Sequence, residues 1–381
     1  MQPPIYLDNN ATTPLAPQVI AAMSAALEVF GNPSSAHSAG KASREIVENA
    51  RASVAKLIGA DTGEVAFTSG GTESDNWAII GALESQPHKN HVVTSRVEHE
   101  AVRKVCEKLE SRGTRVSWID VDGKGDLDID GFRNSIDAST AVVSVMMANN
   151  ETGVLFPIDE IAAIVKENCD ALFHVDAVNA AGKMPIDVKR MGIDLLSLSA
   201  HKFHGPKGIG ALYIRNGLRL PSFQIGGGQE HGRRAGTEAV HQIAGLGAAA
   251  ELAADLSPQA GVRRLRDKLE TAILERFDLA SVNGDVESRL SNTTNISFEN
   301  LNGEMILHYL DEAGICVSTG SACNSESKIS SPVLAAMNVP YSKAMGSVRF
   351  SLGRTNLEEE IISTLASLNE VIPKLRKISG I

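Results

Sequence analysis

The sequence has 381 residues, of which 43% are hydrophobic and 22% are charged, a composition typical of a soluble globular protein. This length exceeds one ordinary hydrophobic core, so we expect two domains. The formal net charge of -10 argues against a nucleic-acid partner, because binding to a phosphate backbone needs clustered lysine and arginine. No apolar run approaches the roughly 20 residues that span a bilayer, and no signal peptide is visible. We therefore expect no membrane contact and a cytoplasmic location.

The cysteine spacing argues against a zinc site, and the basic stretches do not indicate binding to a nucleic acid. The four cysteines show no CxxC spacing, which argues against a zinc or thioredoxin-type site and favours reduced thiols. The two basic stretches, 263–266 and 374–377, have helical spacing, and we expect both to form solvated faces.

Strand-like and helix-like segments alternate over the first two thirds of the chain. The expected strands are Val65–Thr68, Val92–Ser95, Arg115–Ile119, Ala141–Met146, Leu172–Val175, Leu195–Leu198 and Ala211–Ile214. Helical patterns separate several of them, at Glu73–Leu83, Glu98–Leu109 and Ile158–Glu167. This order predicts an α/β fold with a mostly parallel seven-stranded sheet covered by helices on both faces. Ligands bind such sheets beyond the carboxyl ends of the strands.

The pattern changes after about Leu256. A helix is expected from Ser257-Pro258 to about Phe277, and later elements follow at Thr293–Phe298 (strand), Gly303–Glu312 (helix), Val348–Leu352 (strand) and from Glu358 onward (helix). This mixture predicts a smaller α+β domain. We expect the large domain to span 14–257, and the small domain to combine 1–13 with 258–381.

Two residues at neighbouring strand ends indicate a cofactor. Asp176 ends one buried strand, and Lys202 follows the next strand, inside a turn rich in glycine and proline. Taken singly, Asp176 is more often a helix cap and Lys202 more often an exposed loop lysine. Together they are the pair that pyridoxal 5'-phosphate (PLP) needs, a lysine for the Schiff base and an acid for the pyridine nitrogen.

A phosphate site is predicted beside this pair. The turn Thr68–Ser74 joins a strand to a helix, and its glycines let backbone N–H groups approach an anion at the helix N-terminus. Ser199 and His201 flank the lysine and can donate further hydrogen bonds to a phosphate. His99 falls at the same edge of the sheet, where it can stack on a ring or move protons; a lone histidine is more often structural.

These residues belong to a set of motifs that resembles the cysteine desulfurases of the NifS/IscS type, which are class V aminotransferases of PLP fold type I. The matching segments are Tyr6–Thr13, Phe30–Ser35, Ser69–Ser74, Val97–His99, Asn149–Gly153, His174–Ala177, Ser199–Lys202, Arg233–Thr237, Gly320–Cys323 and Arg349–Arg354. The resemblance therefore runs nearly from end to end.

The resemblance implies a role for each matching position. Lys202 would carry PLP, Asp176 would pair with its pyridine nitrogen, and His99 would stack on its ring. The implied phosphate and ring contacts are Gly71, Thr72, Ser199, His201 and Asn179, with Thr237 reaching the phosphate of the other subunit of a homodimer. The implied contacts to substrate are Asn150 (also beside the cofactor), Arg354 and Asn10.

The implied reaction removes sulfur from L-cysteine and leaves L-alanine. Lys202 would move the α-proton, and the thiolate of Cys323 would take the sulfur as a persulfide. A small polar stretch surrounds Cys323, whereas Cys106, Cys169 and Cys316 lie in helical or apolar patterns and are expected to be buried. An iron–sulfur scaffold of the NifU/IscU type would accept the sulfur, with Cys323 as a transient cluster ligand.

The chain departs from the family at two places. Asn179 stands where many relatives have glutamine, near the ring hydroxyl, and the segment 329–332 differs from theirs. The alternatives are a selenocysteine lyase or transaminase-like PLP enzyme, and a catalytically silent assembly platform. Cys323 favours the desulfurase, and intact Lys202, Asp176 and His99 argue against the platform. The sequence leaves open whether nitrogenase maturation, general cluster assembly or tRNA thiolation receives the sulfur.

Overall fold

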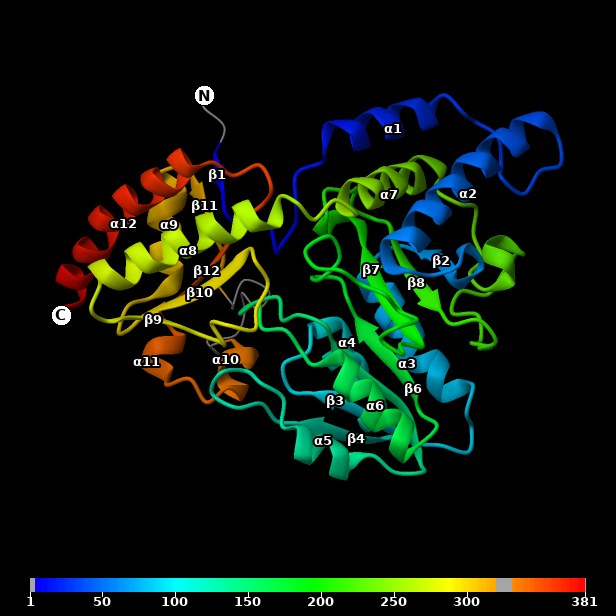
Figure 1. Ribbon diagram of the computed structural model, residues 1–381, viewed down its shortest axis with the longest axis horizontal. Helices are drawn as coiled ribbons and strands as arrows, with labels where there is room; N and C mark the ends of the chain where they lie inside the picture. The colour runs from blue at the N-terminus through cyan, green and yellow to red at the C-terminus, as the bar shows by residue number, and fades with distance from the viewer. Residues whose placement is uncertain (1–3, 320–330, 381) are drawn as a thin grey trace.

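The larger sheet has seven strands, and the computed structural model, which describes residues 4–319 and 331–380, places them as predicted (Figure 1). Their spatial order is β2 (Val65–Thr68), β8 (Gly210–Ile214), β7 (Leu195–Ser199), β6 (Leu172–Asp176), β5 (Thr140–Met146), β3 (His91–Ser95) and β4 (Arg115–Ile119). Only β8 runs antiparallel to its neighbours, because β7 and β2 both pair with it in that sense. The carboxyl ends of β5, β6 and β7 therefore meet at one edge.

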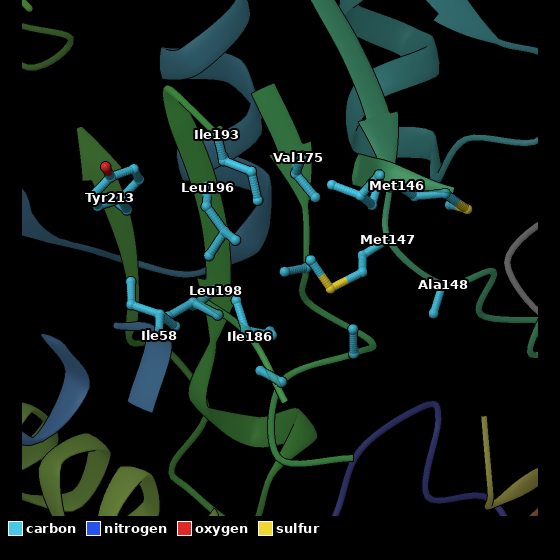
Figure 2. Packing of buried hydrophobic residues seen from close by; sticks show 14 of the residues in the cluster. Ile58, Met146, Met147, Ala148, Val175, Ile186, Ile193, Leu196, Leu198 and Tyr213 are labelled. Carbon is cyan, nitrogen blue, oxygen red and sulfur yellow. The ribbon is translucent and has the colours of Figure 1, made fainter. Parts of the chain in front are cut away.

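Both faces of this sheet are buried by helices. One face packs against α2 (Ser38–Ile58), α5 (Ile129–Ser135), α6 (Ile158–Asn168) and α7 (Val240–Ala253), and α1 (Pro17–Leu27) lies on α7. The other face packs against α3 (Gly71–Glu84) and α4 (Glu100–Glu110). Side chains alternate between the two: Leu195 faces α3, whereas Leu196 and Leu198 face the opposite cluster, beside Val175 (Figure 2).

The expected fold class is confirmed, and the seven strands match their predicted ranges to within one residue at each end. Two long helices, α2 and α7, were absent from the prediction. In α7 the cause is composition, because its Ala and Gly residues carry little hydrophobic periodicity. Its glycines instead permit close approach: a Cβ on Gly247 would lie 2.7 Å from the backbone of Ala50.

A second layered unit lies to the left in Figure 1. Its sheet has the order β12 (Ser347–Ser351), β10 (Thr293–Phe298), β9 (Ala280–Val282), and α8 (Gln259–Arg276), α9 (Gly303–Glu312) and α12 (Glu358–Ser379) share its hydrophobic cluster. Two short helices, α10 (Pro332–Ala336) and α11 (Tyr341–Ala344), precede β12. The N-terminal strand β1 (Ile5–Tyr6) joins this unit by pairing with β11 (Ile315–Cys316), and Leu7 is in its core. The domain boundaries stay a prediction.

The prediction that residues 263–266 form a solvated face is partly wrong. Arg263 is exposed, but the side chain of Arg266 is 2% exposed and donates hydrogen bonds to the carbonyl oxygens of Leu290 (3.0 Å) and Thr293 (3.1 Å). The guanidinium therefore joins α8 to the start of β10. In the part of the chain that the structure describes, no helix is both long and apolar enough for a bilayer crossing.

A buried ion pair fixes the chain between β8 and α7 to α2. Arg51 and Glu230 are each almost fully buried and make two hydrogen bonds, of 2.6 and 3.0 Å. Glu230, in the short 3-10 helix η3 (Gln229–Gly232), also accepts from the backbone N–H of Phe67 in β2. Its φ of 48° is a left-handed value that a non-glycine residue adopts only when surrounding contacts enforce it.

We predict that Glu230→Gln lowers the free energy of unfolding by about 3–5 kcal/mol, because buried Arg51 would keep only the half-exposed carboxylate of Glu48, at 3.3 Å, as a counter-charge. Urea unfolding followed by circular dichroism measures the change. Asp159→Asn, which breaks an exposed pair with Arg190, is the matched control and should cost less than about 1 kcal/mol. Equal losses in the two variants would contradict this account.

Candidate active site

The predicted cofactor residues meet at the carboxyl edge of the large sheet. Asp176 ends β6, where it pairs in register with Met146 of β5 and Ser197 of β7. Lys202 ends the short helix η2 (Ala200–Lys202), which begins directly after β7. The structure thus brings Asp176 and Lys202 together at adjacent strand ends, close enough that the lysine lowers the pKa of the carboxyl.

Asp176 is buried, 5% exposed, and one of its carboxyl oxygens accepts a 2.9 Å hydrogen bond from the backbone N–H of Val178. Burial raises its pKa, while the hydrogen bond and the charges of His99 and Lys202 act in the opposite direction. A ring nitrogen that carries a proton would supply the same kind of compensation. The site therefore fits a cationic heterocycle.

Polar side chains continue beneath Asp176 toward α3. His174 bridges Ser144 of β5 (2.8 Å) and Ser197 of β7 (2.9 Å), and burial lowers its pKa to about 3, so its imidazole is neutral. Asp75 of α3 lies 3.6 Å from the same imidazole. Burial and the nearby charge of Asp176 raise the pKa of Asp75 well above its usual range. This shift favours the neutral form of Asp75 beside Asp176.

Glu98 is a second buried acid beside the site. It accepts hydrogen bonds from the Ser95 hydroxyl (2.6 Å) and from the Met146 backbone (3.1 Å), while its other oxygen has no hydrogen-bond partner among the described residues. Burial raises its pKa to about 8. Glu98 is thus protonated at neutral pH, and it positions the turn that carries His99.

His99 caps the N-terminus of α4. Its Nδ1 accepts a 3.2 Å hydrogen bond from the backbone N–H of Ala101, which leaves Nε2 as the protonated nitrogen of the neutral ring. The imidazole keeps contact with solvent, but protein surrounds it closely enough that burial lowers its pKa, against the opposing charge of Asp176. The ring is therefore neutral at physiological pH.

The N-terminal segment closes the site over Lys202. The Lys202 ammonium donates hydrogen bonds to the backbone oxygens of Asn10 and Ala11. Thr13 binds the His201 carbonyl oxygen through both its N–H group and its hydroxyl, at 2.8 Å each. Two peptide oxygens of the N-terminal segment thus accept hydrogen bonds from the lysine.

The predicted phosphate turn has the geometry of an anion cradle. Gly70, with φ of 151°, precedes the first turn of α3, and a Cβ there would lie 3.7 Å from the Ser199 hydroxyl. Gly71 also lacks room for a side chain, since a Cβ would meet Val178 at 2.6 Å. Thr72 is exposed at the same helix end. Backbone N–H groups and two hydroxyls therefore converge here.

His201 lies at the border of this cradle, with Nδ1 3.2 Å from the Thr12 hydroxyl. Burial, and then the positive charges of Lys202 and Lys207, lower its pKa to about 4. A neutral imidazole can donate a hydrogen bond to a phosphate without adding charge to the site.

The predicted substrate residues lie where the two units meet. The backbone oxygen of Asn150 accepts from Asn10 (3.1 Å) and from Arg349 of β12 (2.9 Å). Arg354, just after β12, donates to the backbone oxygens of Leu252 (3.3 Å) and Asp255 (3.1 Å). Asn10 is 1% exposed, so its amide serves the junction between the units.

Two hollows adjoin this site. A small cavity of about 30 Å³ is lined by Lys202, Lys183 and Arg354, so it contains the groups that chemistry would use. A groove of about 860 Å³ runs between α3 and α4 and reaches the site only at its edge, through Thr72 and His99. We place the chemistry at the smaller cavity, because the charged groups converge there.

Two predicted residues are not placed beside these groups. Thr237 is exposed, in a segment that Arg234 ties to Glu73 of α3 with hydrogen bonds of 2.9 and 3.2 Å. Cys323 lies outside the described residues, so its predicted roles stay predictions. Of the other three cysteines, Cys106 is buried, whereas Cys169 and Cys316 are only half-buried.

Sequence reasoning missed two contributors, Lys183 and Asp75. Lys183 stands four residues after Asn179, a spacing that places the two side chains together on one helical turn. Asp75 follows the phosphate turn by one residue and could be found from the i, i+4 relation to Gly71. Neither spacing alone distinguishes a site residue from an ordinary helical one.

The chain belongs to the class-V aminotransferase family, whose model matches residues 5–363. A cysteine desulfurase of Trichormus azollae is 50% identical over 98% of this chain and 94% of its own length. Among solved structures, a NifS-like protein superposes with a TM-score of 0.92 at 37% identity, covering 98% of this chain and 100% of its own. A structure described as SspA in complex with cysteine gives 0.83 at 35% identity, covering 93% and 100%.

These similarities confirm the resemblance and the predicted cofactor, since enzymes of this family depend on PLP. The residues present fit that group. Lys202 can react with the aldehyde of PLP, and the buried carboxylate of Asp176 suits its pyridine nitrogen. The glycine turn at the N-terminus of α3 suits its phosphate.

We predict that Glu98→Gln makes the cofactor-free protein more stable relative to wild type as pH rises. Glu98 keeps its proton when folded up to a pKa of about 8, whereas its ordinary value is 4.5. The contribution of protonated Glu98 to the free energy of unfolding is complete below the ordinary pKa and is lost as pH rises through the pKa of the folded state. Glutamine keeps the neutral shape, so the relative gain between pH 5 and pH 9 should be on the order of a few kcal/mol.

Thermal unfolding across this pH range measures the effect, with Glu45→Gln on the exposed face of α2 as the control. A wild-type to Glu98→Gln difference that stays constant with pH would mean that Glu98 is ionised when folded.

Proposed function

We propose that this protein is a cysteine desulfurase, which converts L-cysteine to L-alanine and leaves a persulfide on Cys323. The observation that carries the proposal is the assembly of Lys202, Asp176 and His99 at one sheet edge, in a chain that matches cysteine desulfurases over nearly its whole length. PLP, when bound, supplies the electron sink that weakens bonds around the amino acid's α-carbon.

The protein's own residues bind, orient and move protons. Lys202 provides the amine for the cofactor and then carries the α-proton; its ammonium donates hydrogen bonds to the backbone oxygens of Asn10 and Ala11. Asp176 would face the ring nitrogen, and burial together with the charge of Asp176 raises the pKa of neighbouring Asp75. His99 presents a neutral ring with its proton on Nε2, available to a cofactor ring or a reacting group.

Residues at the junction of the two units bind and orient the substrate. Arg354 lines the small cavity beside Lys202, where its guanidinium can bind the carboxylate of cysteine. Asn150 occupies a loop that Asn149 fixes by accepting hydrogen bonds from the N–H groups of Glu151 (2.9 Å) and Thr152 (3.0 Å). A rigid loop keeps the carboxylate, and hence the α-carbon, at a fixed distance from Lys202.

Cys323 is the proposed sulfur acceptor. The thiolate sulfur attacks the substrate sulfur, the bond from that sulfur to Cβ breaks, and the electron pair of that bond takes a proton to complete alanine. One cysteine and one protein thiol thus become one alanine and one persulfide, with no external oxidant.

We also propose a homodimer, with Thr237 contributing to the partner's phosphate site. The exposed position of Thr237 supports this, as do Phe30 and Ile225, which are each 91% exposed. An iron–sulfur scaffold of the NifU/IscU type is the proposed acceptor and the cytoplasm the proposed location. Light scattering tests the dimer, and a monomer at micromolar concentration would contradict it.

We predict that the purified enzyme releases alanine from L-cysteine and gains one sulfur atom on the peptide that contains Cys323. Lys202→Ala should abolish alanine formation, because it removes both the cofactor's anchor and the proton carrier. Cys323→Ser should reduce turnover by at least about 100-fold, since a hydroxyl cannot take the sulfur.

Alanine is measured by chromatography and the persulfide by mass spectrometry of the alkylated peptide. Cys106→Ser is the matched control, because Cys106 is buried in α4 and should keep full activity. Full activity of Cys323→Ser with L-cysteine would refute the sulfur-transfer route.

A further inference from the structure

Lys183 is a second lysine at the site, and its surroundings are unusual. The side chain is half-buried, and its amine donates hydrogen bonds to the amide oxygens of Asn179 (2.8 Å) and Asn10 (3.1 Å). Among the residues that the structure describes, no carboxylate lies within ion-pair distance of it. Even partial burial of a lysine without a counter-charge costs stability, so this position needs a reason.

The charges that face Lys183 are mostly positive. Burial lowers its pKa well below the usual range, and the charges of Lys202 in η2 and Arg349 in β12 act in the same direction. His201 and His204 also lie within range, because the charge of Lys183 contributes to the lowered pKa of each. The amine therefore acts as a hydrogen-bond donor at this place, and ion pairing does not explain it.

The first contact fixes which way the Asn179 amide faces. Its oxygen accepts from Lys183, so its nitrogen must point the other way, where it donates to the Asn149 carbonyl oxygen at 3.3 Å. An amide nitrogen has two N–H groups, and within the described structure the second has no acceptor. Asn179 is 5% exposed, so this second N–H group is buried without an acceptor in the part of the chain that the structure describes.

The second contact ties the same amine to the segment over Lys202. The Asn10 side-chain oxygen accepts from both Lys183 and Asn292 (3.0 Å), and its nitrogen donates to the Asn150 backbone oxygen. The backbone oxygen of Asn10 in turn accepts from Lys202. One residue, Asn10, is therefore shared by the two lysines, and it joins the small unit to the cofactor edge.

We propose that Lys183 is a positioning residue that turns the Asn179 amide so that its N–H group, and not its oxygen, is presented to the ring oxygen of bound PLP. This rests on the proposed function. The chain has asparagine where many relatives have glutamine, and the shorter side chain depends on an external donor for its orientation. Through its hydrogen bond to Asn10, the Lys183 amine also contacts the N-terminal segment that binds Lys202.

The cofactor-free protein tests the contact itself, independently of any reaction. Thermal unfolding midpoints are measured for Lys183→Met, Asn179→Ala and the double variant. If the amine orders the amide, the two single shifts are not additive, because each variant removes the same hydrogen bond. Additive shifts would overturn the proposal. Lys189→Met, an exposed lysine of the same segment, is the control and should be additive with Asn179→Ala.

The PLP-loaded protein tests the positioning. The pH midpoint of the visible absorbance of bound PLP should rise by about one unit in Lys183→Met, because a lost N–H donor no longer stabilises the negative ring oxygen. Asn179→Ala should raise it equally, and the double variant no further. An unchanged midpoint in Lys183→Met would overturn the proposal.

The two experiments separate the proposals. Non-additive midpoints in a protein that never retains PLP would sink the proposed function and leave the Lys183–Asn179 contact intact. Retained PLP, desulfurase activity and an unmoved absorbance midpoint would sink the positioning role alone.

Discussion

A buried negative charge at the end of β6 organises this molecule. Asp176 cannot stay ionised within a protein interior unless nearby groups compensate it, and the charge of Lys202 and the backbone N–H group of Val178 do so. The same demand explains the neutral acids behind it. Burial, and then the charge of Asp176, raise the pKa of both Asp75 and Glu98. Both shifts favour the neutral acids behind the cofactor edge.

The second constraint is the crossing of the N-terminal segment between the two units. Leu7 belongs to the small unit's core, whereas residues three to six positions later contact Lys202 and His201 of the large unit. A movement of the small unit would therefore be transmitted to the oxygens that hold the catalytic lysine. Arg349 adds a parallel link, since it binds Asp8 (2.7 Å) and the Asn150 loop.

Much of this architecture could be predicted from local sequence. Each strand of the large sheet is a short, largely apolar run, and the parallel order of β6 and β7 places Asp176 and Lys202 at adjacent strand ends, which is why that pair was predictable. The glycine turn before α3 was readable for the same reason.

What could not be predicted depends on contacts between distant parts of the chain. Asn10 meets Lys183 across 173 positions and Asn292 across 282, and no local pattern encodes such pairs. The burial of Arg266 is similar, because its partners are the carbonyl oxygens of Leu290 and of Thr293 in β10, which the helical periodicity of α8 does not describe.

The most direct test of the account is to reduce the PLP-loaded protein with borohydride, which fixes a Schiff base to its lysine, and to locate the label by peptide mass spectrometry. The account predicts the label on the peptide that contains Lys202, and its loss in Lys202→Ala. A label on Lys183, or on no single lysine, would contradict it.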